Sequence, residues 1–272
     1  MGKLDGRVAL ISGAGRGIGR SVALMLAAEG ARVVVNDFDP NPAEEVVNEI
    51  RKRGGEAIAC VGSVTDSDFP QRFLASALDT YGDVHIIINN AGYTWDAVIQ
   101  NMTEEQYDAM IDVHLKAPWR ILKEAAEVIR NKSKEEAQNG ERIMRKVVNV
   151  SSVSGTRGNA GQTNYSSAKA GVIGLTRTLA REWGRYNVTV NCVAFGFIRT
   201  RLTEATDEKK IISVGDKEVP IGVPVENIQS IEASIPLGRA GTPVEAAGAV
   251  LLFCFPESDY ISGQVVEVTG GQ

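Results

Sequence analysis

The stretch RVALISGAGRGIG (residues 7–19) decides the fold of this 272-residue chain. Its first half is a short run of apolar, β-branched residues, which is typical of a strand buried in a sheet. A glycine-rich turn follows at once and opens SVALMLAAEG (residues 21–30), which is predicted to be a helix. A strand that passes through such a turn into a helix is the expected beginning of a doubly wound α/β sheet.

Six further apolar runs follow along the chain, with helical patterns between them. Because each run is nearly continuous in apolar residues, we expect a parallel sheet that helices cover on both faces. The sequence therefore predicts one α/β domain over residues 1–272. Such sheets bind ligands at the carboxyl ends of their strands, so the residues after each run are the candidates for chemistry. The six runs are residues 32–37, 56–61, 85–89, 146–151, 188–193 and 264–268.

The composition is that of an ordinary soluble enzyme with a small-molecule substrate. A formal net charge of -5 gives no broad attraction to nucleic acid or to an anionic membrane. The three cysteines lie far apart in apolar runs, which predicts buried free thiols and a reducing, cytoplasmic location. No apolar run is long enough to span a bilayer, and the first residues show no signal-peptide pattern.

Two segments interrupt the alternation of strands and helices. The polar stretch NKSKEEAQNGERIMR (residues 131–145) is predicted to be a solvated excursion that ends a long helix. Residues 201–236 form an unusually long connection that is rich in isoleucine, valine and proline. We expect this segment to be a mobile lid over a hydrophobic substrate, and the alternative is a short helical pair that only completes the core.

The glycine-rich turn SGAGRGIG (residues 12–19) is a candidate phosphate-binding loop. A helix N-terminus offers unpaired N–H groups and the positive end of the helix dipole, and glycines let a pyrophosphate approach the backbone. The spacing Gly13-xxx-Gly17-x-Gly19 differs from the common GxGxxG fingerprint. The alternative is a glycine loop that serves only as a tight turn.

Asp37, at the end of the second run, predicts the cofactor. A carboxylate at this point accepts hydrogen bonds from both ribose hydroxyls of an adenosine and repels a 2′-phosphate. Arg16 in the loop would soften that repulsion. We therefore expect NAD, with NADP as the less favoured cofactor. The alternative is that Asp37 is a solvated cap at the end of a strand.

Tyr165 and Lys169 are four residues apart in a predicted helix, so their side chains share one face. A free tyrosine is a poor base at neutral pH because its pKa is about 10. An ammonium group one turn away, together with a positive nicotinamide ring, favours the phenolate. Tyr165 would exchange a proton with an alcohol or carbonyl, while Ser152 would hold the substrate oxygen for hydride transfer. A YxxxK pair by itself is equally a surface pair.

Taken together, these motifs resemble the short-chain dehydrogenase/reductase family over nearly the whole chain. The resemblance rests on SGAGRGIG, NNAG (residues 89–92), the position of Ser152 thirteen residues before Tyr165, YSSAK (residues 165–169) and FGFIRT (residues 195–200). It implies a Rossmann-like fold with a seven-stranded sheet and a nicotinamide cofactor. It also implies a homotetramer, or less often a dimer.

The resemblance implies a role for each residue of the site. Tyr165 is the acid/base, Ser152 donates to the substrate oxygen, and Lys169 binds the nicotinamide ribose while lowering the tyrosine pKa. Asn90 packs near the cofactor ribose, and Ile198 and Thr200 meet the nicotinamide carboxamide. The implied cofactor-binding residues are Ser12, Gly13, Arg16, Gly17, Ile18, Gly19, Asp37, Ser63, Val64, Asn90, Ala91, Gly92, Tyr165, Lys169, Ile198 and Thr200.

Three positions depart from the family pattern, and one of them is Phe195, which stands before Gly196 where proline is usual. Ser63 stands where an acidic residue often precedes the adenine contact, so we expect the Val64 backbone to make that contact. His114 stands at the fourth position of the catalytic tetrad, where asparagine is usual.

The proline that follows His114 predicts how this histidine acts. Pro118 has no N–H to offer the His114 carbonyl, so we expect a kinked helix with that carbonyl free to hold a water connected to Lys169. The His114 imidazole would then tune this relay only through its charge.

Within the family, the chain is most similar to 3-oxoacyl thioester reductases and (3R)-hydroxyacyl-CoA dehydrogenases. Three of its stretches, VVVND, GSVTD with its serine and VHLKAP with its histidine, are most similar to the (3R)-hydroxyacyl-CoA dehydrogenases. We therefore expect an NAD-dependent enzyme that oxidises a 3-hydroxyacyl-CoA or another hydrophobic secondary alcohol. One alternative is an NAD(P)H-dependent reductase of a cyclic or aromatic ketone. Another is a non-catalytic dinucleotide-binding subunit, although the catalytic residues are present. No Cys or His pair has metal spacing, so we expect no metal, and His85 is expected to be a packed strand residue.

Overall fold

The computed structural model of the protein describes residues 2–206, 210–214 and 217–272. A seven-stranded parallel sheet lies at its centre, with the strand order β11-β6-β5-β4-β1-β2-β3. The predicted Rossmann-like α/β fold is confirmed, since every predicted run forms one strand of this sheet. These strands are β1 (Val8–Ile11), β2 (Arg32–Asp37), β3 (Ala57–Val61), β4 (Ile86–Asn89), β5 (Arg145–Ser152), β6 (Val188–Phe195) and β11 (Val265–Val268).

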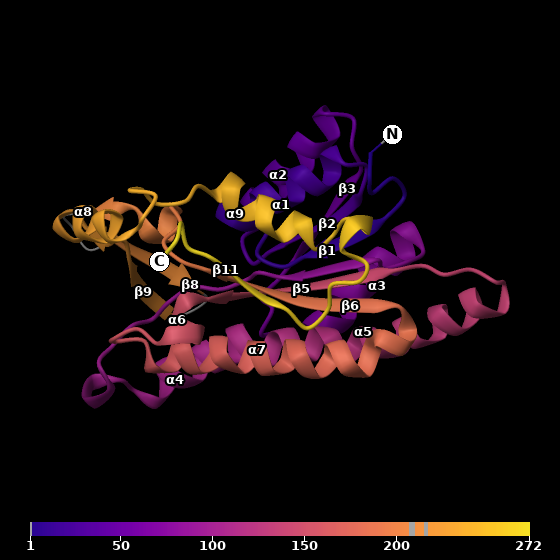
Figure 1. Cartoon of the computed structure of the whole chain (residues 1–272). Coiled ribbons are helices and arrows are strands. Elements are labelled where there is room, and N and C mark those ends of the chain that lie inside the picture. The colour runs from indigo at the N-terminus through magenta and orange to yellow at the C-terminus, as the bar shows by residue number, and fades with distance from the viewer. Residues whose placement is uncertain (1, 207–209, 215–216) are drawn as a thin grey trace.

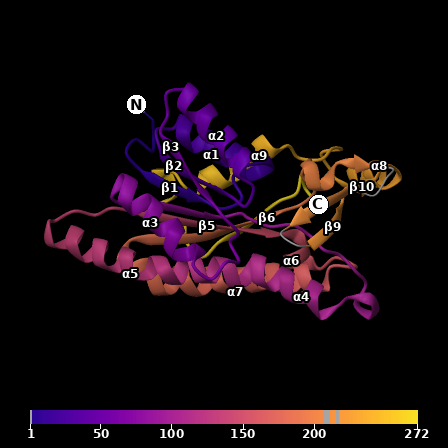
Figure 2. The same ribbon diagram turned by 180° about the vertical axis from the view of Figure 1, so that it is seen from behind.

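Helices cover both faces of the sheet, as Figures 1 and 2 show. Strand β1 explains why both faces need cover: Ala9 and Ile11 enter one apolar cluster, while Val8 and Leu10 enter the other. One layer consists of α1 (Gly17–Ala28), α2 (Pro40–Lys52) and α9 (Pro243–Leu252). The opposite layer consists of α3 (Phe69–Tyr81), α4 (Glu104–Ile111), α5 (Ala117–Gln138) and α7 (Thr163–Trp183).

The strand order reverses at β1: β2 and β3 lie on one side of it, and β4 and the later strands lie on the other. The loops that leave β1 and β4 therefore start side by side at the carboxyl edge, and the Ser12 N–H donates to the Ile88 carbonyl at 3.1 Å. This reversal point is where open α/β sheets bind their ligands. The fold thus places the glycine-rich turn and the NNAG motif at one site.

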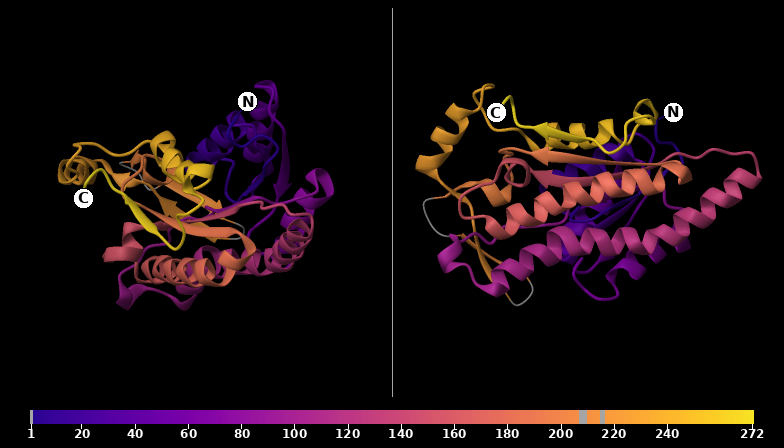
Figure 3. Two further views of the ribbon diagram at one scale, coloured as in Figure 1. Left: turned by 45° about the vertical axis from the view of Figure 1, so that its right-hand side comes forward. Right: turned by 60° about the horizontal axis from the view of Figure 1, so that its bottom comes forward.

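The described parts of the predicted lid, residues 201–206, 210–214 and 217–236, lie beyond the carboxyl edge of the sheet (Figure 3). They contain an antiparallel hairpin and a helix without buried residues, so the alternative of a helical pair that completes the core is wrong. Residues 207–209 and 215–216 of this segment lie outside the described residues, and the lid remains a prediction. Its elements are η4 (Arg201–Thr203), β7 (Ala205–Thr206), β8 (Lys210–Val214), β9 (Lys217–Ile221), β10 (Val223–Pro224) and α8 (Val225–Ser234).

The predicted solvated segment, residues 131–145, contains the end of a long helix and is exposed over residues 137–142, as predicted, but Ser133, Glu136 and Arg145 within it are buried. Helix α5 continues to Gln138, and Arg145 begins β5 with only 2% of its surface exposed. The Arg145 guanidinium donates to Glu136 at 2.6 Å, to Asp83 at 3.1 Å and to the Val84 carbonyl at 3.0 Å. Opposite charges that satisfy one another can be buried, and a count of polar residues along the chain does not reveal such pairs.

The three cysteines, Cys60, Cys192 and Cys254, are buried free thiols, as predicted. Within the described part of the chain, no helix is long and apolar enough to cross a membrane. Over the same residues, no group of three or more His, Cys, Asp or Glu side chains is placed to hold a metal ion.

His85 is buried, as predicted, but it lies directly before β4 and not within a strand. It makes the folded state sensitive to acid. Its Nδ1 accepts the Val8 N–H at 3.1 Å, and burial lowers the pKa of His85 to about 4 against the opposing charge of Asp83. Unfolded His85 binds a proton near its ordinary pKa of about 6.5, whereas folded His85 does not until about pH 4. The free energy of unfolding is therefore expected to fall as the pH falls from 6.5 to 4.

A His85→Asn variant tests this expectation, because its Oδ1 can still accept the Val8 N–H but does not titrate. Urea unfolding between pH 6.5 and 4 should show a pH slope smaller by up to about 1.4 kcal/mol per pH unit than that of the parent. His114 is the only other histidine and is unchanged in the variant. Equal slopes for the two proteins would contradict the assignment to His85.

Candidate active site

The glycine-rich loop leaves the first turn of α1 open to an anion. Helix α1 begins at Gly17, its N-cap Arg16 makes no side-chain capping bond, and its first turn holds no acidic residue. The first N–H groups of this helix thus face the site without a competing carboxylate, as pyrophosphate binding requires. Gly13 has a φ of 63°, and an added Cβ would lie 2.6 Å from the Ala91 Cα. The residues present fit the phosphates of a dinucleotide.

Ser12 and Asn90 join this loop to the NNAG motif. The Ser12 hydroxyl accepts the backbone N–H groups of Asn90 at 3.0 Å and of Ala91 at 3.1 Å. In return, the Asn90 carboxamide donates to the carbonyls of Ser12 at 3.1 Å and Gly13 at 2.9 Å. Residues 78 positions apart in the chain thereby form one rigid wall of the predicted cofactor site.

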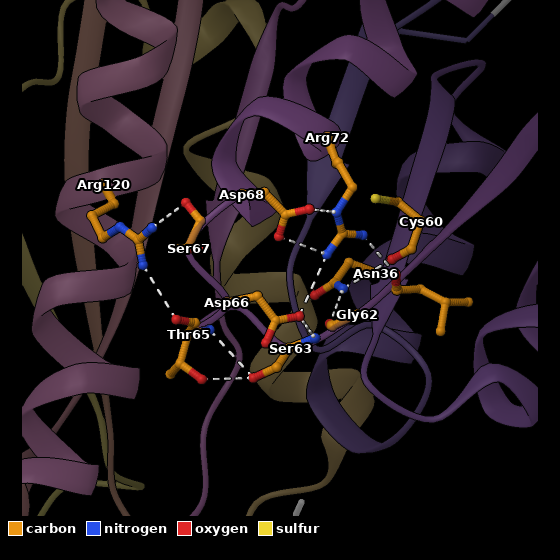
Figure 4. Close-up of polar contacts among 11 residues, drawn as sticks. Asn36, Cys60, Gly62, Ser63, Thr65, Asp66, Ser67, Asp68, Arg72 and Arg120 are labelled. Carbon is orange, nitrogen blue, oxygen red and sulfur yellow. Dashed lines mark hydrogen bonds and ion pairs between the residues drawn. The ribbon is translucent and has the colours of Figure 1, made fainter.

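Asn36 ties the glycine-rich loop to a second loop, and the sequence analysis missed it. Its Oδ1 accepts the Gly13 N–H at 3.2 Å, and its Nδ2 donates to the carbonyls of Cys60 at 2.9 Å and Gly62 at 3.0 Å. Asn36 is 1% exposed, so this carboxamide serves only the protein (Figure 4). An asparagine inside the otherwise apolar run RVVVND was the available signal.

The second loop carries Ser63 and Val64, the predicted adenine contacts, and two arginines hold it in place (Figure 4). Arg72 from α3 donates to Asp68 at 2.8 Å, and Arg120 from α5 donates to two backbone carbonyls of the loop. Val64 is buried against the apolar cluster of this face. The loop is therefore positioned by both of the helices next to it.

Asp37 ends β2 directly beside the glycine-rich loop. Its Oδ2 accepts the Gly15 N–H at 3.1 Å, and its Oδ1 accepts the Asp39 N–H at 3.1 Å. Asp37 is 7% exposed, so the alternative of a solvated strand-end cap is wrong. A carboxylate has about four lone-pair positions, so these two bonds leave capacity for ribose hydroxyls.

The predicted nicotinamide contacts, Ile198 and Thr200, follow β6. They lie on the side of the glycine-rich loop opposite to Asp37. Ile198 pairs with Gly241 in an isolated bridge and is 6% exposed. The Thr200 methyl group lies 3.6 Å from the Cβ position of Gly17. The structure thus places residues from the ends of β2, β4 and β6 around the N-terminus of α1.

Tyr165 and Lys169 lie on one face of α7, as predicted, and Ser152 lies at the end of β5. The Lys169 Nζ is 5.6 Å from the centre of the Tyr165 ring and donates to the Val150 carbonyl at 2.7 Å. Burial raises the pKa of Tyr165 to about 12, although a hydrogen bond from Ser152 opposes the rise. Burial also lowers the pKa of Lys169 to about 8. The phenol is therefore protonated at neutral pH, and a positive charge beside it is needed to form the phenolate.

The π-helical turn η2 (Asp112–Lys116) joins α4 to α5 at His114. We predicted a kink here; the structure instead has one wide turn, in which the Ala117 N–H donates to the Asp112 carbonyl five residues back. The open His114 carbonyl stays a prediction. Pro118 lies in the first turn of α5, where a missing N–H disturbs the helix least. Such wide turns occur often at functional sites.

The His114 ring packs between the NNAG loop and Tyr165. Its Nε2 lies 2.6 Å from the Tyr93 carbonyl, and its plane meets the Tyr165 ring edge-on, with 4.8 Å between ring centres. Burial, with a smaller effect of the Lys169 charge, lowers the pKa of His114 well below its ordinary value. The expectation that the imidazole acts through its charge is therefore wrong, because the ring is neutral at physiological pH.

Gly92 makes room for this ring. A Cβ at position 92 would lie 2.1 Å from the His114 Cε1, closer than any real contact. A glycine is therefore required at position 92 as long as the His114 ring occupies this place.

Three polar residues near Tyr165 were not singled out from the sequence. Asp96 accepts from Gln162 at 2.8 Å, and its charge raises the pKa of Tyr165. Asn164 accepts the Tyr165 N–H at 2.7 Å and donates to the Trp95 carbonyl at 3.0 Å. The polar stretch GNAGQTNY (residues 158–165) contains Gln162 and Asn164 but did not show that they meet Asp96 and Trp95 across the site.

A protein-family model described as "short chain dehydrogenase" matches residues 7–211, which is more than half of the chain. The chain belongs to this family. A short-chain dehydrogenase is an oxidoreductase that works with a nicotinamide dinucleotide.

Several curated short-chain dehydrogenases are similar to this one over nearly their whole length. The 3-oxoacyl-[acyl-carrier-protein] reductase FabG of Thermotoga maritima is 38% identical over 269 residues, covering 99% of this chain and 98% of the relative. The 3-oxoacyl-[acyl-carrier-protein] reductase of Synechocystis is 38% identical, covering 100% and 98%. The FabG of Vibrio cholerae is 37% identical, covering 98% of each chain.

Proposed function

We propose that this protein is an NAD-dependent oxidoreductase that acts on the secondary hydroxyl of a hydrophobic 3-hydroxyacyl thioester, such as a 3-hydroxyacyl-CoA. The observation that carries the proposal is the convergence of Ser152, Tyr165 and Lys169 at the carboxyl edge of the sheet, beside the open N-terminus of α1. The glycine-rich loop, Asp37 and Asn90 would hold a nicotinamide dinucleotide at this edge, and the cofactor would supply hydride transfer to or from the substrate carbon.

Tyr165 moves the proton in this reaction. In the oxidation, its phenolate takes the hydroxyl proton of the alcohol; in the reduction, its phenol returns that proton to the carbonyl oxygen. Lys169 supplies the positive charge that favours the phenolate, and Ser152 donates to the substrate oxygen. His114 contributes its main-chain carbonyl to a water that connects Lys169 to solvent. The missing N–H of Pro118 supports this part of the proposal.

The buried carboxylate of Asp37 supports NAD as the cofactor. The Gly15 N–H fixes this carboxylate at the end of β2. There it would accept hydrogen bonds from the ribose hydroxyls of NAD and repel the 2′-phosphate of NADP. NADP is the less favoured cofactor.

The relatives support a thioester substrate, because those named above are reductases of 3-oxoacyl groups carried on acyl carrier protein. The buried thiols of the chain support a reducing cytoplasm. A homotetramer is the assembly that the resemblance implies, and light scattering of the purified protein measures it. A reductase of cyclic or aromatic ketones is the second candidate, supported by the exposed apolar side chain of Ile211 in the lid segment.

Steady-state kinetics test the proposed function. We expect kcat/KM for a 3-hydroxyacyl-CoA to exceed that for free secondary alcohols and cyclic alcohols, and kcat/KM for NAD to exceed that for NADP by at least about tenfold. Higher rates with free cyclic substrates would favour the second candidate. A preference for NADP would contradict the cofactor assignment, and NAD binding without turnover of any alcohol would indicate a non-catalytic subunit.

A further inference from the structure

Arg16 is the only cation in the loop of residues 12–19, so it is the group of that loop that could bind a 2′-phosphate. Its guanidinium is already engaged, because its Nη2 lies 2.8 Å from the Asp39 Oδ2. Both side chains are about one-third exposed, at 36% and 31%, so the pair lies at the rim of the site. The hydrogen bond from Arg16 is also the main cause that lowers the pKa of Asp39.

The backbone places Asp39 where it can hold this arginine. The Asp39 N–H donates to the Asp37 Oδ1 at 3.1 Å, and the Asp39 Oδ1 caps α2 by accepting the Asn41 N–H at 3.2 Å. The other oxygen of Asp37 accepts the Gly15 N–H at 3.1 Å. One connected set of bonds therefore fixes Asp37, Asp39 and the loop that carries Arg16.

We infer that Asp39 is a second residue that determines cofactor specificity, acting by holding Arg16 in an ion pair and so withholding it from a 2′-phosphate. The inference rests on the proposed preference for NAD. Asp37 repels the phosphate, and Asp39 removes the cation that would offset this repulsion. Arg201 also acts electrostatically on Asp39, so loss of the Asp39 charge would leave a net positive charge at this rim.

The Asp39→Asn variant removes the charge while keeping a side chain that caps helices well. Isothermal titration calorimetry with 2′,5′-ADP and with AMP measures how much the 2′-phosphate contributes to binding, and it needs no turnover. We expect Asp39→Asn to lower the Kd for 2′,5′-ADP by about tenfold, because the freed Arg16 would donate a charged hydrogen bond to the 2′-phosphate. The Kd for AMP should change by less than about twofold. The gain should shrink at high salt.

Two further variants identify the cause of the gain. Glu49→Gln removes an equal charge from the same helix, where it pairs with Arg20 and Arg53, and should leave both Kd values unchanged. Arg16→Ala in the Asp39→Asn background should cancel the gain. A gain that survives without Arg16, or no gain in Asp39→Asn, would overturn the inference.

The Kd values of the parent protein distinguish a failure of this inference from a failure of the proposed function. If the parent binds 2′,5′-ADP more tightly than AMP, the proposed NAD preference fails. If the parent prefers AMP and Asp39→Asn behaves like Glu49→Gln, only the role of Asp39 fails. Thermal unfolding of each variant shows whether its fold is retained.

Discussion

Replacing Tyr165 with phenylalanine is expected to lower kcat by about 10³- to 10⁴-fold, because the substrate then loses its only proton partner in the proposed reaction. The substitution removes one oxygen from a ring that packs against His114, so the shape of the site is retained. Binding of NADH, followed by its fluorescence, should change by less than about threefold. Turnover and binding are thereby measured on the same protein.

Tyr107→Phe is the matched control, since this tyrosine lies on α4 and is 39% exposed. It should retain parental kinetics. A Tyr165→Phe variant that kept more than about a tenth of the parental kcat would show that another group moves the proton.

The second large effect is expected from Lys169→Met, which replaces a buried ammonium with an apolar chain of similar length. We expect kcat to fall by about 10²- to 10³-fold. Without this charge the pKa of Tyr165 rises further, so the pH at which alcohol oxidation reaches half its maximal rate should move upward. Rates between pH 6 and 10 measure this shift, and an unchanged pH profile would contradict the role of the lysine.

Two other variants sharpen that comparison. Lys123→Met removes an exposed lysine that lies over the Trp119 ring, and should leave the pH profile unchanged. His114→Asn keeps the main-chain carbonyl and is expected to lose less than about tenfold in kcat. A much larger loss would assign a catalytic role to the neutral imidazole instead of the carbonyl.

The sheet was predictable from the sequence because buried parallel strands are continuous apolar runs, and helices must separate them. The start of α9 was predictable for a local reason: Thr242 and Glu245 form the capping box that their spacing requires. Tyr165 and Lys169 were predictable in the same way, since one helical turn brings them together.

Contacts between distant segments were not predictable from these local patterns. Asn36 looked like an interruption in a strand, yet it bonds two loops that are far apart in the chain. The sequence predicted that Arg145 and Glu136 are solvated. They are buried because β5 lies beside the end of α5 in the fold, where the two side chains form an ion pair. The burial of His114 depends on Gly92 and Tyr93, which no helical pattern connects to it.

The wide turn at Asp112–Lys116 also limits how this chain can change in length. It spaces its hydrogen-bonded residues five apart, where an α-helix spaces them four apart. Deleting one residue here would restore a regular helix but would rotate α4 by about 100° relative to α5. Met110, now fully buried, would leave its apolar cluster, and position 114 could no longer face both Tyr93 and Tyr165. A single-residue deletion is therefore less tolerable in these five residues than a substitution.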